Sequence, residues 1–86
     1  MNKDEVTKTV IATLERDEPL PKETVEEKLA YRYLDEGHID SFSIMNLIVE
    51  FEVAFNITLS SEDTQSDEFR TASGLVTLIM ARIGHD

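Results

Sequence analysis

The stretch Gly37-His38-Ile39-Asp40-Ser41-Phe42 leads directly into an amphipathic segment that ends near Phe55. From about Ser41 onward, apolar residues recur at the i, i+3, i+4, i+7 spacing of one helix face. The residues of this face are Ile44, Leu47, Ile48, Phe51 and Phe55. The spacing predicts a helix that begins at an acidic residue and a serine. Backbone N–H groups in a first helical turn have no partner within the helix, so we expect an exposed hydroxyl whose surroundings favour an attached anion.

Two further helices are predicted, one on each side of this segment. The first runs from about Lys3 to Glu15, and the last begins after the N-cap residue Thr71 and ends near Gly84. Their inward residues are Val6, Val10, Ile11 and Leu14 in the first helix and Leu75, Leu78, Ile79 and Ile83 in the last.

The connections between these helices carry weaker signals. Residues 24–33 have helical spacing but weak caps, and they predict a long connection with one helical turn, held to the core by Leu29 and Leu34. Residues 60–67 are polar and acidic and are predicted to be mobile, and residues 66–69 are predicted to form a short helical turn. The expected fold is all-α: a single domain over residues 1–86, an antiparallel bundle of three main helices plus one short helix.

Composition narrows the class of protein. Eight Lys and Arg face 18 Asp and Glu, a formal net charge of −10, which argues against nucleic-acid binding and favours partners with basic surfaces. The chain has no cysteine, so disulfides and thiolate chemistry are excluded. No apolar run is long enough to span a membrane, and the first residues lack the apolar core of a signal peptide. We therefore expect a soluble, cytoplasmic monomer.

Gly37, Ile39 and the run Asp40-Ser41-Phe42, followed by a helix ending in Phe55, resemble the acyl carrier protein family. That family includes D-alanyl and other aminoacyl carriers, and its members often read Gly-x-x-Asp-Ser plus an apolar residue. The resemblance covers nearly the whole chain. It implies that Ser41 carries 4'-phosphopantetheine, whose thiol holds an acyl or aminoacyl group as a thioester. It also implies that Asp40 assists installation of this arm by helping a transferase to position its metal ion.

The resemblance further implies three kinds of partner: a phosphopantetheinyl transferase, an ATP-dependent acyl- or aminoacyl-activating ligase, and a downstream acyltransferase or synthase. The expected docking face consists of Phe42, Asn46, Val49, Glu50 and Val53, with Phe42 half-buried. The family often has glutamates where this chain has Asn46 and Val53. This departure indicates a dedicated partner that recognises more apolar contacts. The sequence does not identify the carried group or the pathway.

Other functions explain less of the sequence. A small acidic helical adaptor without a prosthetic group would account for the charge but not for the run from Gly37 to Phe42. A serine hydrolase would need a Gly-x-Ser-x-Gly elbow and an oriented base, and His38 is expected to be only a loop residue. An EF-hand loop centred on Gly37 would place Arg32 and Ser43 at its first and last ligand positions, where carboxylates are required.

Two further expectations follow. We expect neither enzyme activity nor a bound metal in this chain. The acidic residues of the second half are expected to be solvated rather than to form a metal site; they are Glu62, Asp63, Asp67 and Glu68. Without the family resemblance, Asp40 or Ser41 would be interpreted simply as the helix cap.

Overall fold

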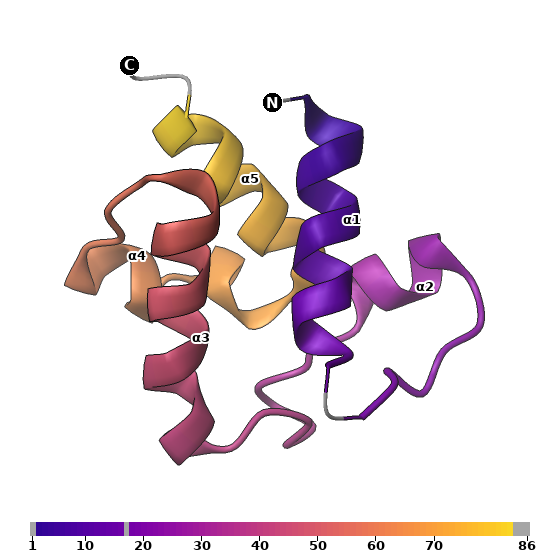
Figure 1. Ribbon diagram of the computed structural model, residues 1–86. Coiled ribbons are helices and arrows are strands. Elements are labelled where there is room, and N and C mark those ends of the chain that lie inside the picture. Colours follow the sequence, from indigo (N-terminus) through magenta and orange to yellow (C-terminus); the bar gives the residue numbers. More distant parts are fainter. Residues whose placement is uncertain (1, 17, 84–86) are drawn as a thin grey trace.

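The computed structural model describes residues 2–16 and 18–83, apart from the side chain of Ser41. The helices are α1 (Lys3–Leu14), α2 (Val25–Ala30), α3 (Ser41–Phe55), α4 (Ser61–Gln65), the 3₁₀ helix η1 (Asp67–Arg70) and α5 (Ala72–Ile83). Within the described ranges there is no strand, so the predicted all-α class is confirmed (Figure 1). The three long helices lie where they were predicted, whereas the connections contain more helix than expected. The predicted stop at Gly84 lies outside the described residues.

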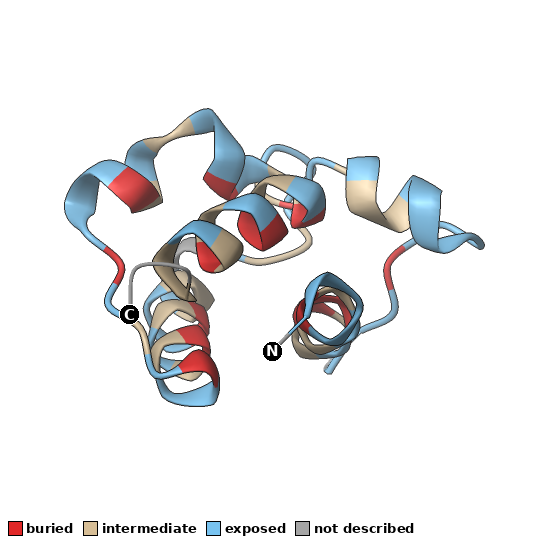
Figure 2. Ribbon diagram, turned by 90° about the horizontal axis from the view of Figure 1, so that it is seen from above, coloured by how far each residue is buried: buried red, intermediate tan, exposed pale blue. Residues whose placement is uncertain are grey.

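The three long helices enclose one core. In Figure 1, α1 runs downward while α3 runs upward, which is the predicted antiparallel arrangement. Figure 2 shows that the buried residues of α1, α3 and α5 face one another. The core residues are Val6, Val10, Leu14, Leu20, Tyr33, Leu47, Phe51, Phe55, Leu59, Phe69, Ala72, Leu75, Val76 and Ile79. Four predicted inward residues, Ile44, Ile48, Leu78 and Ile83, are partly buried and pack against this core.

The first connection is held in place by Tyr33, which is fully buried. Its hydroxyl donates a hydrogen bond to the carbonyl of Phe69, and the two rings meet edge to face with centroids 6.5 Å apart. Burial raises the pKa of the Tyr33 phenol, so this group stays protonated and able to donate. Thr24 caps α2 by accepting from the backbone N–H of Glu27 at 3.1 Å, which corrects the expectation of weak caps.

The segment before η1 was expected to be mobile and is instead an ordered helix. Ser60 and Asp63 form a capping box, in which the Ser60 hydroxyl accepts from the Asp63 N–H at 3.1 Å and the Asp63 carboxylate accepts from the Ser60 N–H at 2.9 Å. The Asp63 carboxylate is buried and also accepts two hydrogen bonds from Arg82 of α5, at 3.0 and 2.5 Å. The expectation that Asp63 is solvated was therefore wrong.

Helix α5 passes very close to η1. A methyl group added at Gly74 would overlap the backbone carbonyl of Glu68. Thr71 caps α5 as predicted, because its hydroxyl accepts from the Gly74 N–H at 3.0 Å. The crossing therefore requires a residue without a side chain.

We predict that Asp63→Asn lowers the melting temperature by roughly 5–10 °C at neutral pH, since it removes a charged acceptor from a buried cluster. The Arg82 guanidinium lowers the pKa of Asp63 below its ordinary value of 3.8. The pair of Asp63 and Arg82 therefore stabilises the fold fully at pH values above 3.8. This contribution is lost as the pH falls through the lowered pKa of Asp63 in the folded protein. Thermal unfolding should be followed by circular dichroism between pH 7 and pH 2. The melting temperature of the variant should fall less on acidification than that of wild type.

The matched control for this prediction is Glu62→Gln, which removes the neighbouring, exposed carboxylate of the same helix. Equal losses of stability in the two variants would contradict a specific role for the Asp63–Arg82 pair.

Candidate functional site

The loop before α3 is fixed at two points. Gly37 has φ +78°, a left-handed conformation that glycine adopts at little cost, and its N–H donates to the Leu34 carbonyl at 3.2 Å. The next N–H, of His38, donates to the Tyr33 carbonyl at 2.9 Å. The His38 ring Nε2 lies 2.8 Å from the carbonyl oxygen of Leu14, to which it donates. The loop is thus tied both to the buried Tyr33 and to the end of α1.

Asp40 caps α3. Its carboxylate accepts from the N–H of Ser43 at 2.8 Å, and its carbonyl accepts from the N–H of Ile44 at 3.2 Å. The hydrogen bond from the Ser43 N–H lowers the pKa of Asp40, so the carboxylate is ionised at neutral pH. The expectation that the N–H groups at this end are free is therefore wrong for Ser43, because Asp40 occupies that donor.

Ser41 is the first residue of α3 and directly follows the capping residue. Its side chain lies outside the described part of the structure, so the accessibility of its hydroxyl stays a prediction. The backbone thus places Ser41 at the N-terminal start of a helix, as the sequence indicated.

The outward face of α3 carries a row of exposed apolar side chains. The exposed fractions are 89% for Phe42, 66% for Met45, 52% for Val49 and 77% for Val53. We call these four residues the outer strip. Their spacing of three, four and four residues places them on one face of the helix. Phe42 was expected to be half-buried, and this expectation was wrong.

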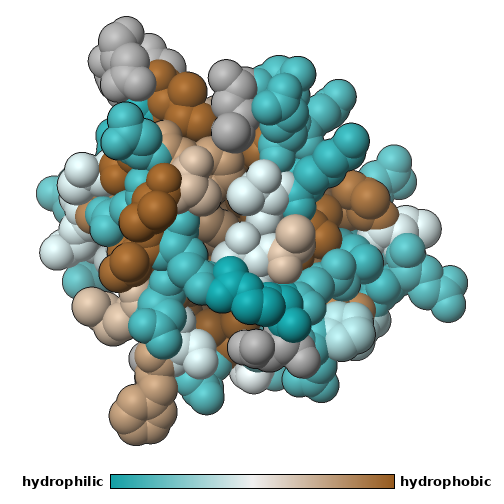
Figure 3. Space-filling model, in the orientation of Figure 1, coloured by the Kyte–Doolittle hydropathy of each residue, from teal (hydrophilic) through white to brown (hydrophobic). Residues whose placement is uncertain are grey.

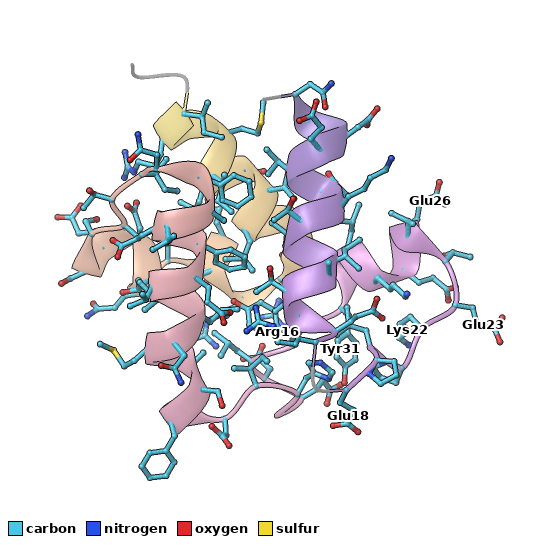
Figure 4. All side chains as sticks on the ribbon, viewed as in Figure 1. Arg16, Glu18, Lys22, Glu23, Glu26 and Tyr31 are labelled. Carbon is cyan, nitrogen blue, oxygen red and sulfur yellow. The ribbon has the colours of Figure 1, made fainter. Side chains whose placement is uncertain are left out.

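Met45 was absent from the predicted docking face, although its spacing from Phe42 and Val49 would have included it. Asn46 is exposed, as predicted, and borders the strip. Glu50 forms an ion pair with Arg16. Figure 4 shows Arg16 near the end of α1. Glu52 accepts from the N–H of Leu59 at 3.0 Å. Both carboxylates of α3 are therefore engaged with other parts of the same chain.

A hollow of about 230 Å³ lies between the end of α1 and α3. It is lined by Thr13, Arg16, Ile39, Ser43, Asn46, Leu47, Val49 and Glu50. Among the residues that the structure describes, no group of three or more His, Cys, Asp or Glu is arranged to hold a metal ion. In the same described ranges, no helix combines the length and the apolar character needed to cross a membrane.

We predict that Asp40→Ala lowers the melting temperature by about 5 °C, because the Ser43 N–H loses its acceptor, and that Asp40→Asn leaves it nearly unchanged, because asparagine is an equally good cap. Thermal unfolding of the three proteins by circular dichroism is the measurement. A loss of stability in Asp40→Asn as large as in Asp40→Ala would show that charge rather than capping is what matters.

Comparison with known proteins adds independent information. No family model matches the chain. The chain is similar to proteins named D-alanyl carrier protein from Bacillus cereus strains B4264 and AH187 and from Bacillus anthracis strain CDC 684 / NRRL 3495. Each is 32% identical to it over 60 residues, which cover 70% of this chain and 76% of the relative.

Proposed function

Since this chain belongs to the acyl carrier protein family, with D-alanyl carrier proteins among its relatives, we propose that it holds an acyl or aminoacyl group as a thioester on 4'-phosphopantetheine attached to Ser41. The observation that carries the proposal is the position of Ser41 at the start of α3, between the capping Asp40 and the exposed Phe42. The name of the relatives supports an aminoacyl group, with D-alanyl as the first to test.

The residues at this end of α3 suit such an arm. A phosphodiester on the first residue of a helix lies near the positive end of the helix dipole. The arm supplies the thiol that forms the thioester, a group that the chain lacks because it has no cysteine. The fixed loop from Gly37 to Asp40 would hold the attachment point still while the arm moves, so that the cargo reaches several enzymes at high effective concentration.

Asp40 is well placed to assist installation of the arm. Its carboxylate is ionised, exposed at the start of α3 and directly before Ser41 in the chain. Carboxylate oxygens are ligands that Mg²⁺ prefers, so this exposed carboxylate can contact a metal ion that the transferase brings. Asp40 would then have two roles, as a helix cap and as a metal contact.

We propose that the chain itself does not catalyse a reaction. The Nε2 of His38 donates a hydrogen bond to the Leu14 carbonyl, so it carries a proton and does not act as a base for Ser41. The proposed partners are a phosphopantetheinyl transferase, an ATP-dependent acyl- or aminoacyl-activating ligase and a downstream acyltransferase or synthase. The chain would meet them as a cytoplasmic monomer.

A small acidic adaptor without a prosthetic group is the second candidate, since an exposed apolar strip also fits simple protein binding. The two functions differ in whether Ser41 is modified.

We predict that the wild-type chain gains the mass of one phosphopantetheine on Ser41 after incubation with coenzyme A, Mg²⁺ and a broad-specificity phosphopantetheinyl transferase. Ser41→Ala should remain folded and gain nothing, because it lacks the hydroxyl that attacks the phosphate. Intact-mass and peptide mass spectrometry are the measurements, with circular dichroism as the folding control. An unmodified wild type under conditions that load a known carrier would favour the adaptor.

We also predict that Asp40→Asn slows the same modification by about tenfold or more while the helix cap is kept, since the metal contact loses its charge. Initial rates at several Mg²⁺ concentrations would test this, and a partial recovery at high Mg²⁺ is expected. Rates equal to wild type at every Mg²⁺ concentration would restrict Asp40 to capping.

A further inference from the structure

The hydrogen bond from the His38 ring to the carbonyl of Leu14 joins two parts of the chain that lie 24 residues apart. Leu14 is the last residue of α1, and the last four carbonyl groups of a helix have no partner within the helix. The Nε2 of His38 donates to one of these carbonyls at 2.8 Å, at the negative end of the α1 dipole. His38 thus caps α1 and at the same time holds the loop that leads to Ser41.

The ring of His38 is held in place by its neighbours. It is half-buried, and the ring of Tyr31 meets it edge to face with centroids 6.5 Å apart. The Lys22 ammonium lies 5.9 Å from the centre of the Tyr31 ring, and Figure 4 shows Lys22 and Tyr31 together near the end of α1. The backbone N–H of His38 also donates to the Tyr33 carbonyl at 2.9 Å. Because the side chain is already fixed, its hydrogen bond to Leu14 costs little further conformational entropy.

The first turn of α3 has few anchors of its own. Among the described side chains of this helix, Phe42 is 89% exposed, Ile44 is partly buried, and Leu47 is the first that is buried. Asp40 caps the backbone of α3 but does not connect it to another helix. Ile39 is partly buried against the core, but an apolar contact fixes no direction. The orientation of this turn therefore depends on a directional contact in the loop before it.

His38 supplies this contact close to the attachment point. Among the described side chains between Gly37 and Asp40, that of His38 is the one hydrogen-bonded to a helix other than α3. The surface around the end of α1 is mostly hydrophilic, as Figure 3 shows, which favours a polar link at this junction. Three residues of extended chain span at most about 10 Å, so a fixed His38 leaves Ser41 little room to move.

We propose that His38 is a positioning residue for attachment of the arm: its hydrogen bond to the Leu14 carbonyl holds the start of α3 in the orientation in which the Ser41 oxygen attacks coenzyme A. This role rests on the proposed function of the chain. In the reaction, the Ser41 oxygen bonds to the phosphorus next to pantetheine and the pyrophosphate bond breaks. The adenosine bisphosphate leaves with the electron pair, and a base of the transferase takes the hydroxyl proton.

His38 acts on this reaction through geometry alone, since its Nε2 is engaged with Leu14. A displaced nucleophile reaches the attacking geometry less often, which lowers the rate of the chemical step. The Gly-x-x-Asp-Ser pattern leaves position 38 open, so this role belongs to the present chain.

The test measures the steady-state kinetics of arm attachment by a purified broad-specificity phosphopantetheinyl transferase, with coenzyme A, Mg²⁺ and the apo chain. His38→Leu has no donor, so kcat should fall about tenfold. KM for the chain should stay within about twofold, because the exposed side chains of α3 are unchanged. His38→Gln should recover most of kcat, because its amide nitrogen can donate from a similar place. His38→Asn, whose amide is one carbon shorter, should not.

Asp63→Asn is the control for stability, because it weakens the pair with Arg82 in another part of the fold. It should keep the kcat of wild type at a temperature at which circular dichroism shows every variant folded. Amide hydrogen exchange is the second measurement. The N–H groups of Ser43 and Ile44 should exchange about tenfold faster in His38→Leu than in wild type, and at nearly the wild-type rate in His38→Gln. If His38→Leu does not fold, the comparison of His38→Gln with His38→Asn decides.

Three outcomes would overturn the inference. A wild-type kcat in both His38→Leu and His38→Asn, or equal losses in His38→Gln and His38→Asn, would show that the donor does not matter. An equal loss of kcat in Asp63→Asn would assign the effect to general stability. If the wild type gains no arm while a known carrier is loaded, the proposed function fails and the inference fails with it. If the wild type is loaded and every His38 variant keeps its kcat, the inference alone fails.

Discussion

Tyr33 is the residue on which the geometry of the site depends. Its buried hydroxyl holds the carbonyl of Phe69, just before α5, and its own carbonyl accepts from His38, just before α3. One side chain and one backbone group thus join the long first connection to both of the helices that follow it. A buried phenol without an acceptor would be costly, so this arrangement strongly favours a single conformation of the loop that leads to Ser41. The hydrogen bond from His38 to Leu14 then secures the same loop to α1.

Helix α3 serves two purposes with opposite faces. Leu47, Phe51 and Phe55 point inward and provide a large share of the core, so the helix is held by apolar packing. The outer strip lies on the opposite face and takes no part in this packing, because its side chains are exposed. The carboxylates between the two faces hold the edges of the helix to Arg16 and to the backbone of Leu59. An acidic protein can in this way present an uncharged surface along one of its helices.

The three long helices could be predicted from the sequence, because apolar residues at helical spacing, such as Val6, Val10 and Leu14, mark the buried face of a helix. The sequence also predicted Asp40 next to a helix start, which is a local pattern. It did not predict the order of α4, because Asp63 gains its partner Arg82 from 19 residues away, and local polarity carries no sign of that contact. It placed Phe42 half inside, although the spacing of Phe42 from Met45 and Val49 puts it on the outward face of α3. The accessibility of the Ser41 hydroxyl and its modification remain predictions.

The crossing of η1 and α5 at Gly74 makes the direction of the last helix sensitive to a single residue. Acidity and an Asp-Ser pair can arise in many small helical chains, whereas a residue lacking a β-carbon at this one contact is demanded by the backbone itself. Any larger residue would force α5 away from η1 and so displace Phe69, the acceptor of the Tyr33 hydroxyl. Glycine three positions after the α5 cap is accordingly the residue that lets η1 and α5 approach this closely, so the direction of the last helix depends on one missing side chain.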